Sequence, residues 1–164
     1  MKKYVSVFAY IASIVAANWM TSTFGMVSLI WFTVTAGTFA AGFALILRDA
    51  AQAFAGSKVV LVAIAVGAVV SYATSSQMIA LASGIAFLFG ELVDFAVFTP
   101  LKNKSVPIAV LASSVAGAPV DTVLFLQISG FGVTPQAVIG QFIVKTTLAG
   151  LVAWWIACST SQAA

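Results

Sequence analysis

The feature of this sequence that most limits its fold is a series of six long apolar stretches separated by short polar breaks. Each stretch approaches the roughly 20 residues that an α-helix needs to cross the hydrocarbon core of a bilayer. Charged residues make up only 7% of the 164 residues, whereas soluble domains carry about 25%. A soluble fold of this length cannot hide so much apolar surface. The sequence therefore predicts an all-α membrane protein, a six-transmembrane helix bundle that forms one domain over residues 1–164.

The breaks in hydropathy set the bounds of the predicted spans. They are residues 4–21, 27–47, 59–73, 78–99, 106–128 and 135–156. Pro100 ends the fourth stretch, and Pro107 and Pro135 suit the first turns of the fifth and sixth helices. Because Pro119 removes a backbone hydrogen bond inside the fifth stretch, we expect that helix to be broken near Pro119. The short linkers predict antiparallel neighbours.

The basic residues predict the orientation in the membrane. Six of the seven lie on one side of the predicted bundle, namely Lys2, Lys3, Arg48, Lys58, Lys102 and Lys104. Since such residues gather on the cytoplasmic side, we expect a multi-pass protein of the cytoplasmic (inner) membrane with both termini in the cytoplasm. The first stretch is also typical of a cleaved signal peptide. Cleavage would leave an odd number of helices and spoil the charge pattern, so we interpret this stretch as a span.

The sequence lacks the residues that several kinds of catalytic and metal site need. The sequence contains no histidine and a single cysteine, Cys158. This excludes an internal disulfide, a cysteine metal cluster and the nucleophile arrangements that pair Ser or Cys with His. No glycine-rich phosphate loop is present, and the scattered basic residues form no face for nucleic acid. We therefore expect no enzyme activity, no metal site, no cofactor and no nucleic-acid partner.

Four charged residues fall within the predicted spans, where a charge costs about 2.5–3.5 kcal/mol on insertion scales. They are Glu91, Asp94, Asp121 and Lys145. Glu91 and Asp94 are spaced i,i+3 and share one helix face. Lys145 could pair with one carboxylate and only hold two helices together, because buried charges also pair for structural reasons. Three acids against one base leave acid in excess, so we favour a polar cavity as the explanation of the set.

Uncharged polar residues extend this candidate site. Gln141 lies one turn before Lys145, on the same helix face. Asn18 lies at a similar depth in the first span, and Ser114 lies near the predicted break in the fifth. A helix break beside a carboxylate at mid-membrane depth is typical of a transporter binding site. We therefore expect substrate contacts from Glu91, Asp94, Asp121, Lys145, Gln141, Asn18 and Ser114.

Two other features have simpler interpretations. Arg48 ends the second predicted span, where its side chain can extend to the cytoplasmic headgroups. Gly37 and Gly42, with neighbouring alanines, form a small-residue helix face. Such a face allows close helix packing, either within one chain or between the two chains of a homodimer.

Several segments together resemble one known family. They are TAGTFAAG at 35–42 with LRDAAQ at 47–52, GELVD at 90–94 with PLK at 100–102, the segment 113–125 and the segment 141–145. The chain is similar to the vitamin-uptake or queuosine-precursor transporter family, whose members have six spans. The resemblance implies import of 7-cyano-7-deazaguanine or a related deazapurine. The partners that it implies are the lipid bilayer and a small purine-like substrate.

The residues leave other functions open. A substrate-binding subunit of an energy-coupling-factor vitamin importer would also have about six spans, and it would copurify with ATPase partners. A small proton- or ion-conducting membrane protein would line a pore with the same acids and would pass current without substrate. A purely structural protein would tolerate alanine at both Glu91 and Asp121. The energy source also stays open between protons, another ion and trapping of the substrate after entry.

Overall fold

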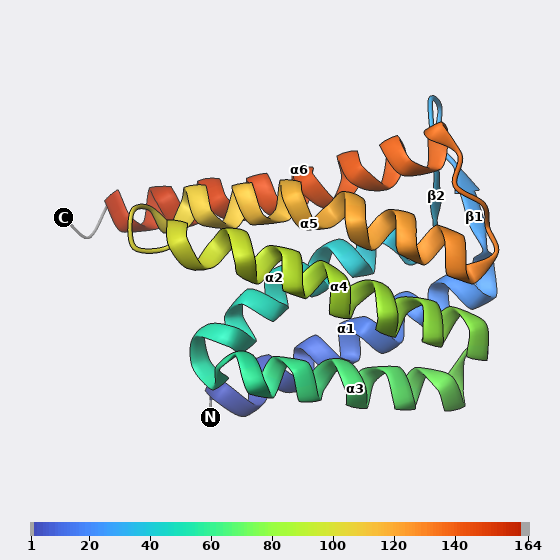
Figure 1. Ribbon diagram of the computed structural model, residues 1–164, viewed down its shortest axis with the longest axis horizontal. Helices are drawn as coiled ribbons and strands as arrows, with labels where there is room; N and C mark the ends of the chain where they lie inside the picture. Colours follow the sequence, from blue (N-terminus) through green and yellow to red (C-terminus); the bar gives the residue numbers. More distant parts are fainter. Residues whose placement is uncertain (1, 162–164) are drawn as a thin grey trace.

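Six α-helices and one β-hairpin make up the structure, a computed structural model that describes residues 2–161. The helices are α1 (Lys2–Phe24), α2 (Thr38–Ala55), α3 (Ser57–Thr74), α4 (Gln77–Leu101), α5 (Val106–Ser129) and α6 (Pro135–Ser161), and the strands are β1 (Met26–Ser28) and β2 (Thr33–Thr35). Successive helices run in opposite directions, so α1 begins and α6 ends at the same end of the bundle (Figure 1). The predicted all-α, six-helix fold is confirmed.

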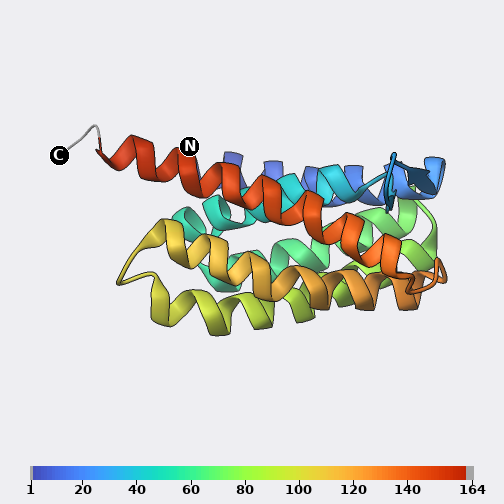
Figure 2. The ribbon, with the colours of Figure 1, turned by 90° about the horizontal axis from the view of Figure 1, so that it is seen from above.

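The helices pack as two groups of three in chain order. In the first group α1 lies against α2 and α3, and in the second α5 lies against α4 and α6. The groups meet where α3 packs on α4 and where α2 and β2 pack on α6. Figure 2 shows that the helices of both groups lie along one common direction. The interior between the groups is therefore the place where side chains from five or six helices can converge.

Five helices in the described residues are long and apolar enough to cross a membrane, and α2 is not among them. The outward faces of the bundle carry large apolar side chains that the chain itself leaves uncovered. Val69 on α3 and Ile108 on α5, for example, are 71% and 62% exposed. Apolar faces of this kind are stable against lipid, so the structure is that of a multi-pass membrane protein.

The second predicted span, residues 27–47, is wrong in its first part. Residues 26–35 form an antiparallel hairpin in which Val27 pairs with Val34, and α2 begins only at Thr38. The segment is rich in β-branched and aromatic residues, which suit strands. The hairpin lies at the end of the bundle opposite the first residues of α1 and packs on α6 beside Gly140 (Figure 1). The helix itself continues past the predicted end to Ala55.

The predicted break in the fifth helix is also wrong. α5 is helical from Val106 to Ser129, with Pro119 inside it. At the same level α5 packs closely on α4, because a Cβ added at Gly117 would lie 3.2 Å from the carbonyl oxygen of Gly90. A proline inside a membrane helix is tolerated where a neighbouring helix packs against it. Close packing on α4 thus replaces the break that we expected.

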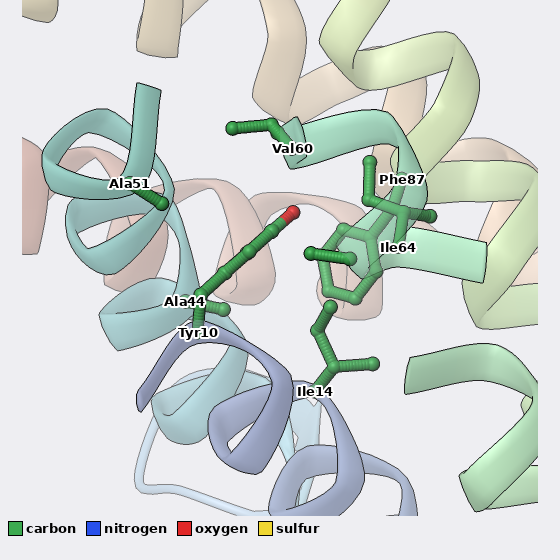
Figure 3. Packing of buried hydrophobic residues seen from close by; sticks show 8 residues of the cluster. Tyr10, Ile14, Ala44, Ala51, Val60, Ile64 and Phe87 are labelled. Atoms are coloured by element: carbon green, nitrogen blue, oxygen red, sulfur yellow. The ribbon is translucent and has the colours of Figure 1, made fainter. Parts of the chain in front are cut away.

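An apolar core fills the space between α1, α2, α3 and α4. Figure 3 shows Tyr10 and Ile14 of α1 directed toward Val60 and Ile64 of α3, with Phe87 of α4 beside them. All five side chains are buried. Because Phe87 also lines the two cavities described below, this core forms one wall of the candidate site.

The small-residue face of α2 packs inside the chain. A Cβ added at Gly37 would collide with Ala17 and Thr21 of α1, and one added at Gly42 would collide with Leu148 of α6. The amide of Gly37 also donates to Thr21 Oγ1 at 3.1 Å. Of the two uses predicted for this face, packing within one chain is the one observed at these glycines.

Candidate functional site

Arg48 lies at the centre of a buried ion-pair cluster that joins α2 to α4. Its Nη1 lies 2.8 Å from Glu91 Oε2 and 2.5 Å from Asp94 Oδ2. Its Nη2 lies 2.9 Å from Asp49 Oδ1. The i,i+3 spacing of Glu91 and Asp94 puts both carboxylates on the face of α4 that meets α2. We call this group the arginine cluster.

The interpretation of Arg48 as an interfacial side chain is wrong. Arg48 is 2% exposed and is the largest of the fully buried side chains in the described residues. The physical reason is the position of the helix, since α2 begins later and ends later than predicted. Arg48 thus lies within α2 rather than at its end, and its guanidinium enters the bundle to meet the carboxylates of α4.

A second ion pair joins α5 to α6. Lys145 Nζ donates to Asp121 Oδ2 and, at 3.0 Å, to Thr122 Oγ1. Lys145 and Asp121 are both buried, so each removes the large penalty that the other would meet alone. The predicted mid-membrane base is therefore paired with Asp121, and it makes no ion pair with Glu91 or Asp94 in the structure.

Two amide side chains lie beside this ion pair without hydrogen-bond partners for their nitrogens. Asn18 Nδ2 of α1 and Gln141 Nε2 of α6 are both buried and find no acceptor among the described residues. Asn18 and Gln141 are only 2% and 1% exposed. Most buried polar atoms in proteins are hydrogen-bonded, so an unpaired one indicates a water or ligand position.

Two small cavities follow the interior of the bundle. The hairpin-side cavity is lined by residues that include Asn18, Thr38, Ser83, Phe125, Gln141 and Lys145. The arginine-side cavity is lined by residues that include Tyr10, Arg48, Glu91, Asp94, Ser113 and Ser114. Phe87 and Asp121 line both and separate them. Each has a volume of ≈ 20 Å³, which is room for about one water molecule. Neither cavity therefore has room for a larger ligand without movement of the helices around it.

The structure buries all seven predicted site residues and divides them between the two cavities. Those at the arginine-side cavity are Glu91, Asp94 and Ser114, those at the hairpin-side cavity are Asn18, Gln141 and Lys145, and Asp121 lines both. Sequence reasoning missed Arg48, Thr38 and Thr122. For Arg48 there was a signal, because it lies in the LRDAAQ segment that contributes to the family resemblance. Thr38 and Thr122 carried the same signal, because they lie in the segments 35–42 and 113–125 of that resemblance.

A comparison with known families finds a match over most of the chain. The family model described as "Putative vitamin uptake transporter" matches residues 4–159, which includes all the residues of both ion-pair clusters and both cavities. No curated protein and no solved structure matches the chain.

Proposed function

Since this chain belongs to the putative vitamin uptake transporter family, we propose that it imports a small planar purine-like base into the cell. The substrate proposed is the queuosine precursor 7-cyano-7-deazaguanine or a close relative. In this proposal the bundle lies in the cytoplasmic membrane with both termini inside, because the flanking basic residues gather at that end.

The observation that carries the proposal is the pair of unpaired amide nitrogens at the hairpin-side cavity. Asn18 Nδ2 and Gln141 Nε2 are buried donors without acceptors. Leaving a buried donor unpaired costs about 1–3 kcal/mol, so an acceptor entering this cavity gains that energy. Unlike Ser71 Oγ, which is also buried and unpaired, these two donors lie together at one cavity beside an ion pair, and this grouping supports a binding site.

The chemistry of a deazaguanine suits the residues around this cavity. Its ring carbonyl and nitrile accept hydrogen bonds, which Asn18, Gln141 and Lys145 can donate. Its ring N–H and exocyclic amine donate, and a carboxylate such as Asp121 can accept both. Phe125 lines the same cavity and offers an aromatic face to a planar ring. Because the base is neutral, the ion pair can stay neutral around it.

The volume of the cavities requires movement during transport. A space of ≈ 20 Å³ cannot hold a bicyclic base, so the structure corresponds to a closed state in which the helices must separate to admit substrate. The natural division is between the two groups of three helices, because Asn18 lies on α1 while Asp121, Gln141 and Lys145 lie on α5 and α6. Rocking of one group against the other would open the site to each side in turn.

The test uses cells that cannot make the precursor and are given it at low concentration. Expression of this protein should restore queuosine to their tRNA, and Gln141→Ala should abolish the rescue. Ser71→Ala is the matched control, because Ser71 Oγ is also buried and unpaired but lies on α3 and does not line either cavity. The control variant should support normal rescue.

Binding is measured separately on purified protein by thermal stabilisation. The base should stabilise the wild type and the Ser71→Ala variant, and an analogue lacking the exocyclic amine should bind far more weakly, because a buried acceptor is then left unpaired. If the wild type neither binds the base nor restores modified tRNA, the substrate assignment is wrong.

A further inference from the structure

The geometry of the arginine cluster brings two carboxylates to the same nitrogen atom. Glu91 Oε2 and Asp94 Oδ2 both lie within 2.8 Å of Arg48 Nη1. Two carboxylates that share one guanidinium nitrogen repel each other in a water-poor interior, and this repulsion favours protonation of one of them unless enough positive charge is near.

The positive charge around Glu91 and Asp94 is smaller than the negative charge of the carboxylates. From α2 the pair faces Arg48, which also forms an ion pair with Asp49. From α1 it faces the phenol of Tyr10, and from α5 it faces Asp121, both across the arginine-side cavity. Asp121 is already matched by Lys145. One guanidinium thus stands against three carboxylates. Because Asp49 is partly exposed, the buried part of the cluster, Arg48 with Glu91 and Asp94, carries a formal charge of −1.

A second observation indicates that something is bound or exchanged here. Asp94 Oδ1 and Arg48 Nε are buried atoms without hydrogen-bond partners among the described residues, and both residues line the arginine-side cavity. The cavity volume of ≈ 20 Å³ admits a water molecule between such atoms. A water molecule at this carboxyl oxygen would provide the step by which a proton enters or leaves the buried site.

We propose that Glu91 and Asp94 form a proton-binding site that holds one proton in the closed bundle. The proton arrives from water and forms an O–H bond to one carboxylate, which removes one negative charge and leaves the other carboxylate paired with Arg48. Because both carboxylates face the same nitrogen of Arg48, we assign the proton to the pair rather than to one residue. Since Arg48 lies on α2 and the pair lies on α4, loss of the proton changes the contact between the two helix groups. The inference goes beyond the proposed substrate and does not depend on it.

The experiment is infrared difference spectroscopy on the purified protein in lipid, without any substrate. The spectrum at neutral pH is compared with the spectrum at high pH, where the proton is lost. The wild type at neutral pH should show the carbonyl-stretch band of one protonated carboxylic acid per chain. Glu91→Gln and Asp94→Asn should each lose that band completely, because the remaining acid of the pair is then ionised beside Arg48. Asp49→Asn is the matched control, since it removes a carboxylate from the same guanidinium but not from the shared nitrogen, and it should keep the band.

The proposal is overturned if the wild type shows no such band at neutral pH. It is also overturned if the band persists in both Glu91→Gln and Asp94→Asn, or if only Asp49→Asn removes it. The wild-type measurement decides the question even if one variant fails to fold, which size-exclusion chromatography would show. Because no substrate is used, failure of this test leaves the identity of the cargo untouched, and failure of the cargo leaves this test valid.

Discussion

The pair of Lys145 and Asp121 allows a direct test of whether the buried charges only hold helices together. Lys145→Met keeps the volume of the side chain and removes its charge, which leaves Asp121 buried without a counter-ion. Both residues are more than nine-tenths buried, so the loss should be near the full cost of breaking a buried pair, about 3–5 kcal/mol. Asp121→Asn should be destabilising in the same way, because it strands the ammonium group.

The double variant Asp121→Asn, Lys145→Met removes both charges. Replacing a whole buried pair is often neutral, so the double variant should return to within about 1 kcal/mol of the wild type. For a chain of this size 1 kcal/mol corresponds to about 2–4 °C in unfolding temperature. The single variants should therefore unfold roughly 6 to 20 °C below the wild type, and the double variant only a few degrees below it.

Thermal unfolding of detergent-purified protein, followed by size-exclusion chromatography, measures these differences, and uptake of the base measures function. A folded double variant with no uptake supports a role of the pair in the site. A folded double variant with normal uptake would show that the pair is structural only and would refute the proposed contact of Asp121 with substrate. Single variants as stable as the wild type would refute the reasoning about the ion pair itself.

Two further predictions concern packing and topology. Gly140→Ala places a Cβ 2.7 Å from Phe32 Cδ2, so it should displace the hairpin and lower stability by about 1–3 kcal/mol, measured by thermal unfolding. Gly150→Ala, whose added Cβ meets nothing within 4 Å, is the control and should unfold like the wild type. A fluorescent reporter that folds only in the cytoplasm should be bright when inserted at Lys58, and darkness there would contradict the predicted orientation.

The bounds of α3, α4 and α5 could be predicted to within two residues because polar residues and prolines interrupt the apolar stretches. The fifth span was expected over 106–128 and α5 occupies Val106–Ser129, with Pro107 in its first turn as expected. The sixth begins at Pro135 as expected. Local signals such as these depend only on residues that are close together in the chain, so they can be recognised without knowledge of the tertiary contacts.

The second span could not be predicted in the same way. Hydropathy does not distinguish an apolar hairpin from an apolar helix, and residues 26–35 are as apolar as a span. This error moved the helix toward the N-terminus and placed Arg48 at its end, which made the interfacial interpretation reasonable. The prediction of a break at Pro119 failed for a related reason. The contacts of α5 with α4 keep the helix continuous there, although the local propensity of proline favours a break.

The members of the candidate site were more accessible to prediction than their pairing. Every charged residue expected inside the bundle is buried. This could be predicted because the free-energy cost of exposing a charged side chain to lipid follows from the residue type alone. Which acid meets Lys145 depends on the relative rotation of α5 and α6, and that is a property of packing. The arginine cluster needed a correct start for α2 before it could be recognised.

The buried position of Arg48 also has a consequence for how the chain enters the bilayer during synthesis. α2 leaves the ribosome before α4, so Arg48 is made well before the carboxylates that neutralise it. An arginine alone at membrane depth opposes insertion by about 2.5–3.5 kcal/mol, and α2 is not among the helices that are long and apolar enough to cross a membrane. It should therefore wait at the membrane surface or beside the insertion machinery until α4 supplies Glu91 and Asp94. On this expectation α4 brings α2 into place, and the order of assembly differs from the order of translation.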